Sequence, residues 1–315
     1  MLYFTAMKMK NFSDDLKEIL VLPTSAALHP SIEDEVKGFF EKLGFSLRYL
    51  LNPFENYGSY DNLFTSHSVE QRFQALKEEF GRDEPALILS ARGGVGAQDL
   101  LSVMKELPEP KSPKLFSGFS DFTFLFNALT DLENISVLHG PSLLSFRDEV
   151  TLSQREKNWR DLYNAVFGKT EKFLQKDELT YLSGSVGGKV TGDLYGGNLS
   201  VLCSLQGTPY STEMKGKILF LEEVKEAPHK VYRNILHLEH SGVFDQLSGL
   251  ILGEFLSCHH PKGVGPSVSD IFKVCFEKYD YPVYRTSAFG HGESIRSFPI
   301  GAKSSLSSDG LSIVV

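Results

Sequence analysis

The sequence has few cysteines and no pattern among them that would make a disulfide framework. Its 315 residues include three, Cys203, Cys258 and Cys275, which are widely separated and odd in number. A disulfide-stabilised secreted domain uses a dense, even set of cysteines. We therefore expect a reducing compartment, and 41% hydrophobic residues are enough to form a core without cross-links.

Long runs of one charge and long hydrophobic runs are also missing. The chain carries 32 basic and 40 acidic residues, for a net charge of −8, so neither a nucleic-acid partner nor an anionic membrane surface is expected. No stretch reaches about 18 uninterrupted apolar residues. The first residues, MLYFTAMKMKNFSDD, lack the apolar core and small-residue cleavage site of a signal peptide, so a cytoplasmic protein is expected.

Several motifs that would bring a cofactor or metal are absent. HExxH and paired CxxC do not occur, and the histidine pairs His237/His240 and His259/His260 are weak metal signals. The segment GGKV (187–190) has valine where a P-loop needs serine or threonine. No metal site is therefore predicted.

What the first half does contain is an alternation of apolar runs and helical patterns. This alternation predicts an α/β domain with a parallel sheet covered on both faces. The predicted strands are residues 18–23, 45–51, 86–91, 114–119 and 135–140. The predicted helices are residues 31–44, 68–81, 96–107 and 120–132.

The pattern changes after about residue 150. A polar helix is predicted over 151–168, and glycine-rich, β-like pieces fill 180–205. Strands are predicted over 217–224 and 247–255, and helices over 231–244 and 268–280. Residues 282–292 are predicted as a strand that enters a Gly–His–Gly turn. We predict an N-terminal domain over 1–150, a linker over 151–180 and a smaller β-rich α/β C-terminal domain over 181–315.

The segment GFSDFT (118–123) is a candidate nucleophile turn, because it joins a predicted strand to a predicted helix. Gly118 leaves room, the turn presents Ser120, and the helix N-terminus directs N–H groups toward a developing oxyanion. Phe122 stands where the usual G-x-S-x-G elbow has its last glycine. The alternative is an ordinary helix N-cap.

A second candidate is the glycine-rich turn ARGGVGAQDLL (91–101), which follows a predicted buried strand. Adjacent glycines let backbone N–H groups approach a ligand, as an oxyanion hole or a phosphate cradle. As a dinucleotide fingerprint it fails, because Asp99 stands where the third glycine belongs. A plain tight turn is the alternative.

Candidate acids and bases lie in the second half. Glu222 and Glu223 end an apolar strand and point to opposite faces, so one of them at most enters a given cleft. His291 stands between two glycines after a strand, which suits an accessible general base. The alternatives are a solvated strand end and an incidental loop histidine; His139, in LHGP, is a weaker candidate for lining the site.

Taken together, seven blocks in order resemble the LD-carboxypeptidase family (peptidase family S66), which includes the microcin C immunity-type peptidases. The blocks are LPTS (22–25), ARGGVGAQDLL, KLFSGFSDFTFLFNAL (114–129), VLHGP (137–141), GDLYGGNLSVLCSLQGTPY (192–210), KILFLEEV (217–224), and PVYRTSAFGHG (282–292) followed by FPIGAKSSL. The resemblance implies a Rossmann-like or flavodoxin-like N-terminal domain with a parallel sheet and a smaller β-rich C-terminal domain.

The resemblance also implies a serine peptidase with the triad Ser120, Glu222 and His291. Backbone N–H groups of Gly94 and Asp121 would form the oxyanion hole, and Arg92, Gly93 and Asn198 would contact substrate. The implied reaction is cleavage of the L-D bond before the terminal D-alanine of murein tetrapeptides in peptidoglycan recycling, without a metal or organic cofactor and as a homodimer.

Two other functions stay open for this chain. One is an immunity-type peptidase that cleaves a peptidyl- or aminoacyl-adenylate-like antibiotic. The other is a non-catalytic relative that only binds its ligand. The chain departs from the family pattern at Val95, where tyrosine is usual, and in the aromatic segment 52–67.

Overall fold

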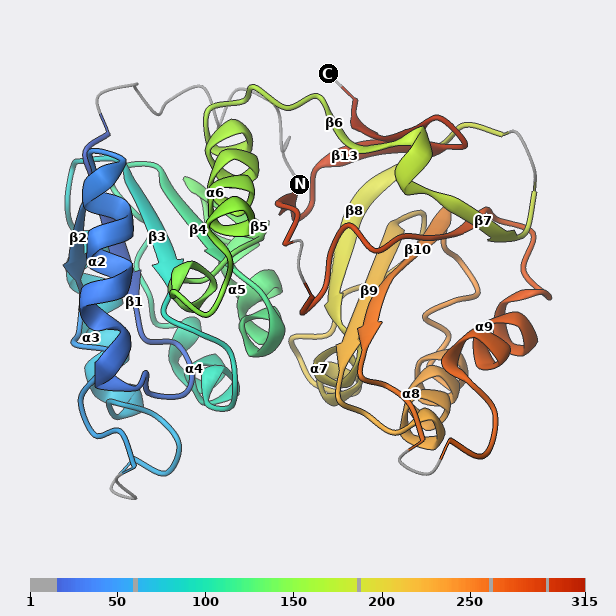
Figure 1. Cartoon of the computed structure of the whole chain (residues 1–315), viewed down its shortest axis with the longest axis horizontal. Coiled ribbons are helices and arrows are strands. Elements are labelled where there is room, and N and C mark those ends of the chain that lie inside the picture. The colour runs from blue at the N-terminus through green and yellow to red at the C-terminus, as the bar shows by residue number, and fades with distance from the viewer. Residues whose placement is uncertain (1–15, 59–61, 186–187, 261–262, 293–294, 315) are drawn as a thin grey trace. The chain divides into compact units, whose positions relative to one another are not determined.

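The computed structural model describes residues 16–58, 62–185, 188–260, 263–292 and 295–314. The chain divides into two compact units (Figure 1). The N-terminal unit runs to Lys169 and includes Ser297–Pro299, and the C-terminal unit comprises Thr170–Arg296 and Ile300–Val315. This division falls between Lys169 and Thr170, while the bounds of the predicted linker over 151–180 stay a prediction.

The N-terminal unit is built on a six-stranded sheet of order β12-β5-β4-β3-β1-β2. Strands β1 to β5 are parallel, and β12 pairs antiparallel with β5 at the edge. Its strands are β1 (Glu18–Leu22), β2 (Ser46–Tyr49), β3 (Ala86–Ser90), β4 (Lys114–Gly118), β5 (Ile135–His139) and β12 (Phe298–Pro299). The order 2-1-3-4-5 is the flavodoxin-like one, in which ligands bind at the carboxyl ends of the strands near the β1/β3 switch point.

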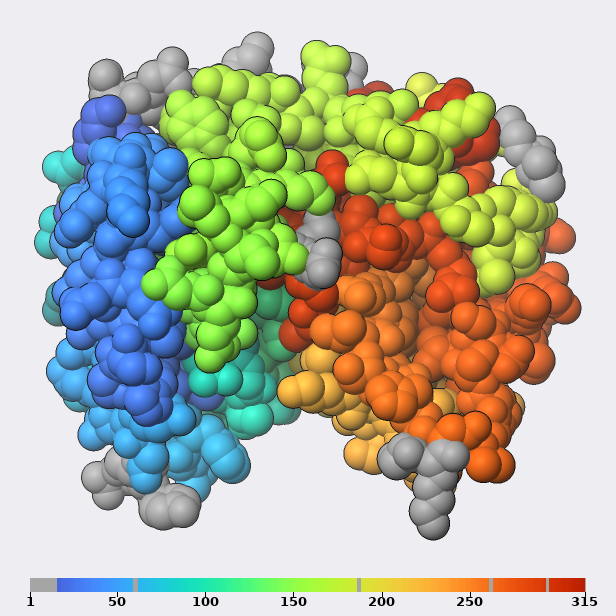
Figure 2. Space-filling model, in the orientation of Figure 1, coloured from blue at the N-terminus to red at the C-terminus, as the bar shows by residue number. Residues whose placement is uncertain are grey.

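The α-helices of this unit each bury apolar side chains. The helices are η1 (Pro30–Ile32), α2 (Glu33–Lys42), α3 (Val69–Phe80), α4 (Ala97–Met104), η2 (Ser120–Leu125), α5 (Phe126–Thr130), η3 (Leu143–Phe146) and α6 (Leu152–Val166). Ser68 and Gln71 form a capping box at the start of α3. Helices α2 and α6 lie side by side (Figures 1 and 2), with the rings of Phe40 and Trp159 5.4 Å apart.

The C-terminal unit has an eight-stranded mixed sheet of order β6-β14-β13-β8-β9-β10-β11-β7. Its strands are β6 (Lys172–Gln175), β7 (Thr180–Ser183), β8 (Val190–Asn198), β9 (Ile218–Val224), β10 (Gly249–Leu256), β11 (Val283–Arg285), β13 (Lys303–Ser307) and β14 (Gly310–Ile313). Strands β8 to β11 are parallel, and the outer strands pair antiparallel. Its helices are η4 (Lys176–Glu178), α7 (Leu199–Leu205), α8 (Pro228–His240) and α9 (Val268–Phe276).

The predicted fold class is confirmed: a parallel flavodoxin-like sheet is followed by a β-rich α/β unit. One local prediction is wrong and another is refined by the structure. Residues 199–205, predicted as β-like, form α7, because the Asn198 side chain caps that helix by accepting from the Val201 N–H. The predicted helix over 120–132 begins as the 3-10 turn η2 and becomes α-helical only at Phe126.

No helix in the described part of the chain is long and apolar enough to span a bilayer.

A buried ion cluster supports the N-terminal sheet. The Lys114 ammonium on β4 is fully buried, lies 3.2 Å from the Glu79 carboxylate and donates to the Glu84 carbonyl at 2.7 Å. Glu79, on α3, also pairs with Arg48 at 3.0 Å. The desolvated ammonium therefore depends on the buried Glu79 carboxylate.

Replacing Glu79 should expose that dependence. We expect Glu79→Ala to lower the free energy of unfolding by about 3–5 kcal/mol, because it leaves the Lys114 charge buried without its partner. The matched control is Glu78→Ala on the exposed face of the same helix, which should stay within about 0.5 kcal/mol of wild type. Urea unfolding measures both, and equal losses would contradict this account.

Candidate active site

Ser120 follows β4 on a strained turn. Its φ is +62°, a left-handed conformation that costs a residue with a side chain about 1–3 kcal/mol and persists only where neighbouring structure imposes it. The side chain is partly exposed, and η2 begins at this residue. Gly118 is needed before it, because a methyl group there would lie 2.5 Å from the Phe122 ring. The serine predicted as nucleophile thus sits at a sharp strand–helix turn.

The glycine-rich turn after β3 lies directly against Ser120. A methyl group on Gly93 would lie 2.8 Å from both Cβ and Oγ of Ser120 and 3.5 Å from the Asp121 nitrogen. Gly94 and Gly96 have φ of +116° and +124°, where side chains are strained. Glycine at 93 therefore lets the backbone approach the serine oxygen.

The Asp121 side chain joins these two turns. It is 5% exposed, and its Oδ2 accepts from the Ala97 N–H at 2.8 Å, at the start of α4. Burial raises the pKa of the Asp121 carboxyl, while the bonds from Ala97 and the Ser25 side chain and the nearby Arg72 charge oppose that rise. A carboxylate at a helix N-terminus also interacts favourably with the helix dipole.

Arg92 is engaged with the backbone of the same region. Its Nε donates to the Gly93 carbonyl at 3.2 Å and its Nη1 to the Ala27 carbonyl at 3.3 Å. Burial lowers the pKa of the guanidinium. These bonds give Arg92 a part in shaping the turn, and the substrate contacts predicted for Arg92 and Gly93 stay predictions.

The C-terminal unit brings Glu222 and His291 together. Glu222 on β9 is fully buried, and its Oε2 lies 2.6 Å from His291 Nδ1. The second oxygen, Oε1, has no hydrogen-bond partner among the described residues. When Nδ1–H donates to this carboxylate, the neutral imidazole carries its lone pair on Nε2. The His291 side chain is 17% exposed, so the ring remains accessible.

Glu223, the neighbouring acid, is occupied elsewhere. Its Oε1 accepts from Asn198 Nδ2 at 3.0 Å, and its Oε2 accepts from the Ser200 N–H at 3.0 Å and from Ser200 Oγ at 2.5 Å. Glu223 therefore ties the end of β8 to the start of α7. The Asn198 amide is part of this network, and its predicted substrate contact stays a prediction.

The two glycines beside His291 are required by Glu254 on β10. A methyl group on Gly290, whose φ is +138°, would lie 2.8 Å from Glu254 Cβ, and one on Gly292 would collide with the Glu254 carboxylate. The Glu254 N–H donates to the Phe289 carbonyl at 2.9 Å. The histidine loop thus runs closely along β10.

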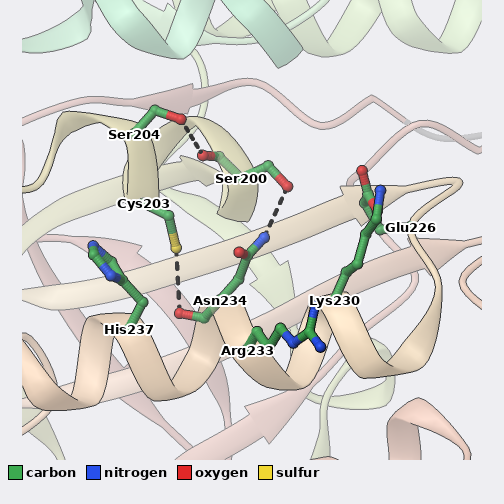
Figure 3. A pocket seen from close by; sticks show the side chains of 8 residues that line it. All are labelled: Ser200, Cys203, Ser204, Glu226, Lys230, Arg233, Asn234 and His237. Carbon is green, nitrogen blue, oxygen red and sulfur yellow. Dashed lines mark hydrogen bonds and ion pairs between the residues drawn. The ribbon is translucent and has the colours of Figure 1, made fainter.

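An open pocket of about 480 Å³ lies between α7 and α8. Figure 3 shows Ser200 and Cys203 facing Asn234, with the Cys203 thiol donating to the Asn234 carbonyl at 3.2 Å. Burial raises the pKa of Cys203 to about 12, and that of Cys258 to about 11. Neither thiol supplies the thiolate that a cysteine nucleophile requires at neutral pH.

His139, the weaker histidine candidate, lies among aromatic side chains in the N-terminal unit. His139 is fully buried, and its ring centroid lies 6.2 Å from those of Phe119, Phe126 and Phe298. Within the described ranges no group of three or more histidine, cysteine, aspartate or glutamate side chains could hold a metal ion.

Sequence reasoning missed Arg72, which is 1% exposed and donates to the Gly96 carbonyl. A signal was present: Arg72 occupies the buried stripe of α3 four residues before Leu76. The sequence could not say which backbone it meets, since its partners lie 24 and 48 residues away.

Comparison with protein families gives the class of this protein, a peptidase and therefore a hydrolytic enzyme. The N-terminal domain model of the LD-carboxypeptidases matches residues 19–140, and their C-terminal domain model matches residues 191–306. The chain belongs to the LD-carboxypeptidase family, and the predicted family is confirmed.

Known proteins agree with this membership. The chain is 29% identical to a probable murein peptide carboxypeptidase of Bacillus subtilis, over 91% of this chain and 87% of the relative. Its fold resembles the crystal structure of muramoyltetrapeptide carboxypeptidase from Oxalobacter formigenes (TM-score 0.76, 22% identity, 94% and 99% of the chains). It also resembles the microcin C7 self immunity protein MccF in complex with aspartyl sulfamoyl adenosine (TM-score 0.77, 19% identity, 95% and 96%).

The contact between Gly93 and Ser120 generates a prediction. We expect Gly93→Ala to slow labelling of Ser120 by a fluorophosphonate about 10²-fold, because the new methyl group displaces the serine side chain. Gly38→Ala in α2, where a methyl group meets nothing within 4 Å, is the control. Intact-protein mass spectrometry measures the rates; an unchanged rate in folded Gly93→Ala would refute the role of the close approach.

Proposed function

We propose that the protein is a serine-type LD-carboxypeptidase that removes the terminal D-alanine from murein tetrapeptides. The observation that carries this proposal is the 2.6 Å hydrogen bond between buried Glu222 and accessible His291. A nucleophilic serine needs a neighbouring base whose tautomer is held by a third group. The murein substrate is supported by the names of the Bacillus and Oxalobacter relatives.

The proposed roles follow from the protonation states. His291 Nε2 takes the Ser120 proton as the serine oxygen attacks the carbonyl before the terminal residue. Glu222 holds the Nδ1–H tautomer and stabilises the imidazolium that forms. The same imidazolium protonates the leaving amine of D-alanine. Water, activated in turn by His291, then hydrolyses the acyl-enzyme.

Backbone donors would stabilise the tetrahedral intermediate. The N–H of Asp121 lies at the start of η2, and the N–H of Gly94 belongs to the turn that lies against Ser120. Preorganised donors of this kind contribute about 10²–10³ to kcat each. Ser120, in its left-handed conformation, is partly exposed, as a nucleophile that meets substrate must be.

This role suits a cytoplasmic enzyme of peptidoglycan recycling, and a homodimer remains part of the proposal. A second candidate is an immunity-type peptidase that acts on acyl-sulfamoyl adenosines. It is favoured by one observation, the likeness of the fold to MccF in complex with aspartyl sulfamoyl adenosine.

A paired assay separates the two candidates. The purified protein is incubated with L-Ala-γ-D-Glu-meso-diaminopimelyl-D-Ala, with the same peptide ending in L-alanine, and with aspartyl sulfamoyl adenosine. We expect D-alanine release from the first alone, read by mass spectrometry. Cleavage of only the nucleoside would replace the proposal by the second candidate, and cleavage of the L-alanine peptide would remove the LD assignment.

Ser120→Ala tests the nucleophile directly. Because removing a triad nucleophile costs about 10⁶ in kcat, we expect D-alanine release to fall to background while the thermal midpoint stays near that of wild type. Turnover near the wild-type rate by the folded variant would exclude the serine mechanism.

The two adjacent acids make a matched pair of variants. Glu222→Gln should lower kcat about 10⁴-fold, because the amide no longer fixes the imidazole tautomer. Glu223→Gln should lower the thermal midpoint, since its amide NH₂ opposes the Ser200 donors, and leave kcat within about threefold. The opposite pattern would show that Glu223 is the catalytic acid.

A further inference from the structure

One buried charge has no part in the mechanism described above. The Arg72 guanidinium, on α3, is 1% exposed and bonds to backbone carbonyls instead of to a close carboxylate. Its Nη1 donates to the Thr24 carbonyl at 2.7 Å and to the Gly96 carbonyl at 2.9 Å. Its Nη2 lies 3.8 Å from the carboxylate of Asp99, which is 56% exposed. Burying a cation costs free energy unless it is paired or hydrogen-bonded, and here the hydrogen bonds go to backbone carbonyls.

The carbonyls that Arg72 binds belong to two loops at the carboxyl edge of the parallel sheet. Thr24 follows β1, and Gly96 closes the glycine-rich turn after β3. These two strands flank the switch point of the sheet. A third carbonyl, that of Ser68, accepts from Arg72 Nε at 3.4 Å.

Asp121 connects the same assembly to the Ser120 turn after β4. Its carboxylate accepts from the Ala97 N–H, one residue beyond the carbonyl that Arg72 binds, and from the Ser25 side chain, one residue beyond Thr24. Arg72 and Asp121 also attract each other electrostatically. Arg72 and Asp121, two buried side chains of opposite charge, therefore both form hydrogen bonds to the loop after β1 and to the turn after β3.

We infer that Arg72 is a positioning residue of the oxyanion site: with Asp121 it clamps the β1 loop and the Gly93–Gly96 turn against the Ser120 turn. This inference rests on the proposed function, in which Ser120 is the nucleophile and Gly94 an oxyanion donor. Arg72 itself is buried and contacts backbone, so it acts on the reaction through the turn.

The clamp matters because the turn has little tolerance for movement. Gly93 already lies so close to Ser120 that a methyl group does not fit between them. Without Arg72, the Thr24 and Gly96 carbonyls lose a buried donor, and the turn is free to move away from the serine. An oxyanion donor acts in the transition state, so its displacement lowers kcat and leaves KM nearly unchanged.

Arg72→Ala, assayed with the murein tetrapeptide, tests this inference. We expect kcat to fall about 10²-fold with KM within about twofold of wild type. Guanidinium ion at a low, non-denaturing concentration should fill the vacated site and restore part of kcat, while urea at the same concentration should not. Arg82→Ala, which removes a 57% exposed arginine just after the same helix, should behave as wild type.

Arg72→Lys keeps the test decisive if Arg72→Ala does not fold. Lysine retains the charge but lacks the planar fork that reaches two carbonyls, so we expect a loss of about tenfold in kcat without rescue by guanidinium. A folded Arg72 variant with wild-type kcat would overturn the inference, as would a rise in KM alone or equal rescue by urea. If instead Ser120→Ala remains active, the proposed function fails, which is a separate result.

Discussion

The close approach of Gly93 to Ser120 is the constraint on which the local structure around Ser120 depends. It requires glycine at 93, the left-handed conformation at Ser120, and loops that do not drift apart. A strained residue is kept only where its surroundings are fixed. Here the surroundings are fixed by hydrogen bonds from the end of the Gly93–Gly96 turn to Asp121 and to Arg72. The strained turn at Ser120, the buried charges of Arg72 and Asp121 and the strand order of the sheet together hold the backbone around Ser120 in place.

In the C-terminal unit, the local structure depends on a different physical effect, the hydrogen bonding of buried carboxylates. Glu222 is fully buried on a central parallel strand, and its hydrogen bond to His291 offsets part of the cost of removing a carboxylate from water. For Glu223, the cost of burying the carboxylate is offset in part by hydrogen bonds that it accepts from Asn198 and Ser200. Adjacent residues on one strand thereby acquire distinct roles, one toward an imidazole and one toward a helix start.

Much of the fold could be predicted because the spacing of apolar residues along the sequence indicates which side chains are buried. The apolar strands and capped helices of the N-terminal unit carry their pattern locally, and the parallel sheet follows from their alternation. Helix α7 could not be predicted in this way, since its seven residues follow a glycine-rich strand and are set by one cap, Asn198. The start of η2 depends on the turn at Ser120, which is a tertiary constraint.

For the site, sequence reasoning could name residue types but not their partners. Alternation along β9 indicated that only one of Glu222 and Glu223 faces a given neighbour, and the bond to His291 adds which neighbour that is. Arg72 carried a signal as a charge on an apolar helical stripe, yet its partners are backbone carbonyls of distant loops. Backbone partners leave no trace in residue identity, so a clamp of this kind becomes visible only in three dimensions.

We propose that the Ser120 hydroxyl is made reactive by the His291–Glu222 pair. Mapping the site of fluorophosphonate labelling by peptide mass spectrometry, in the wild-type protein and in His291→Ala, tests it most directly. An unactivated serine hydroxyl is a weak nucleophile, so the account predicts one adduct, on the peptide that contains Ser120, and its loss in His291→Ala. Labelling at another residue, or equal labelling of Ser120 in both proteins, would contradict it.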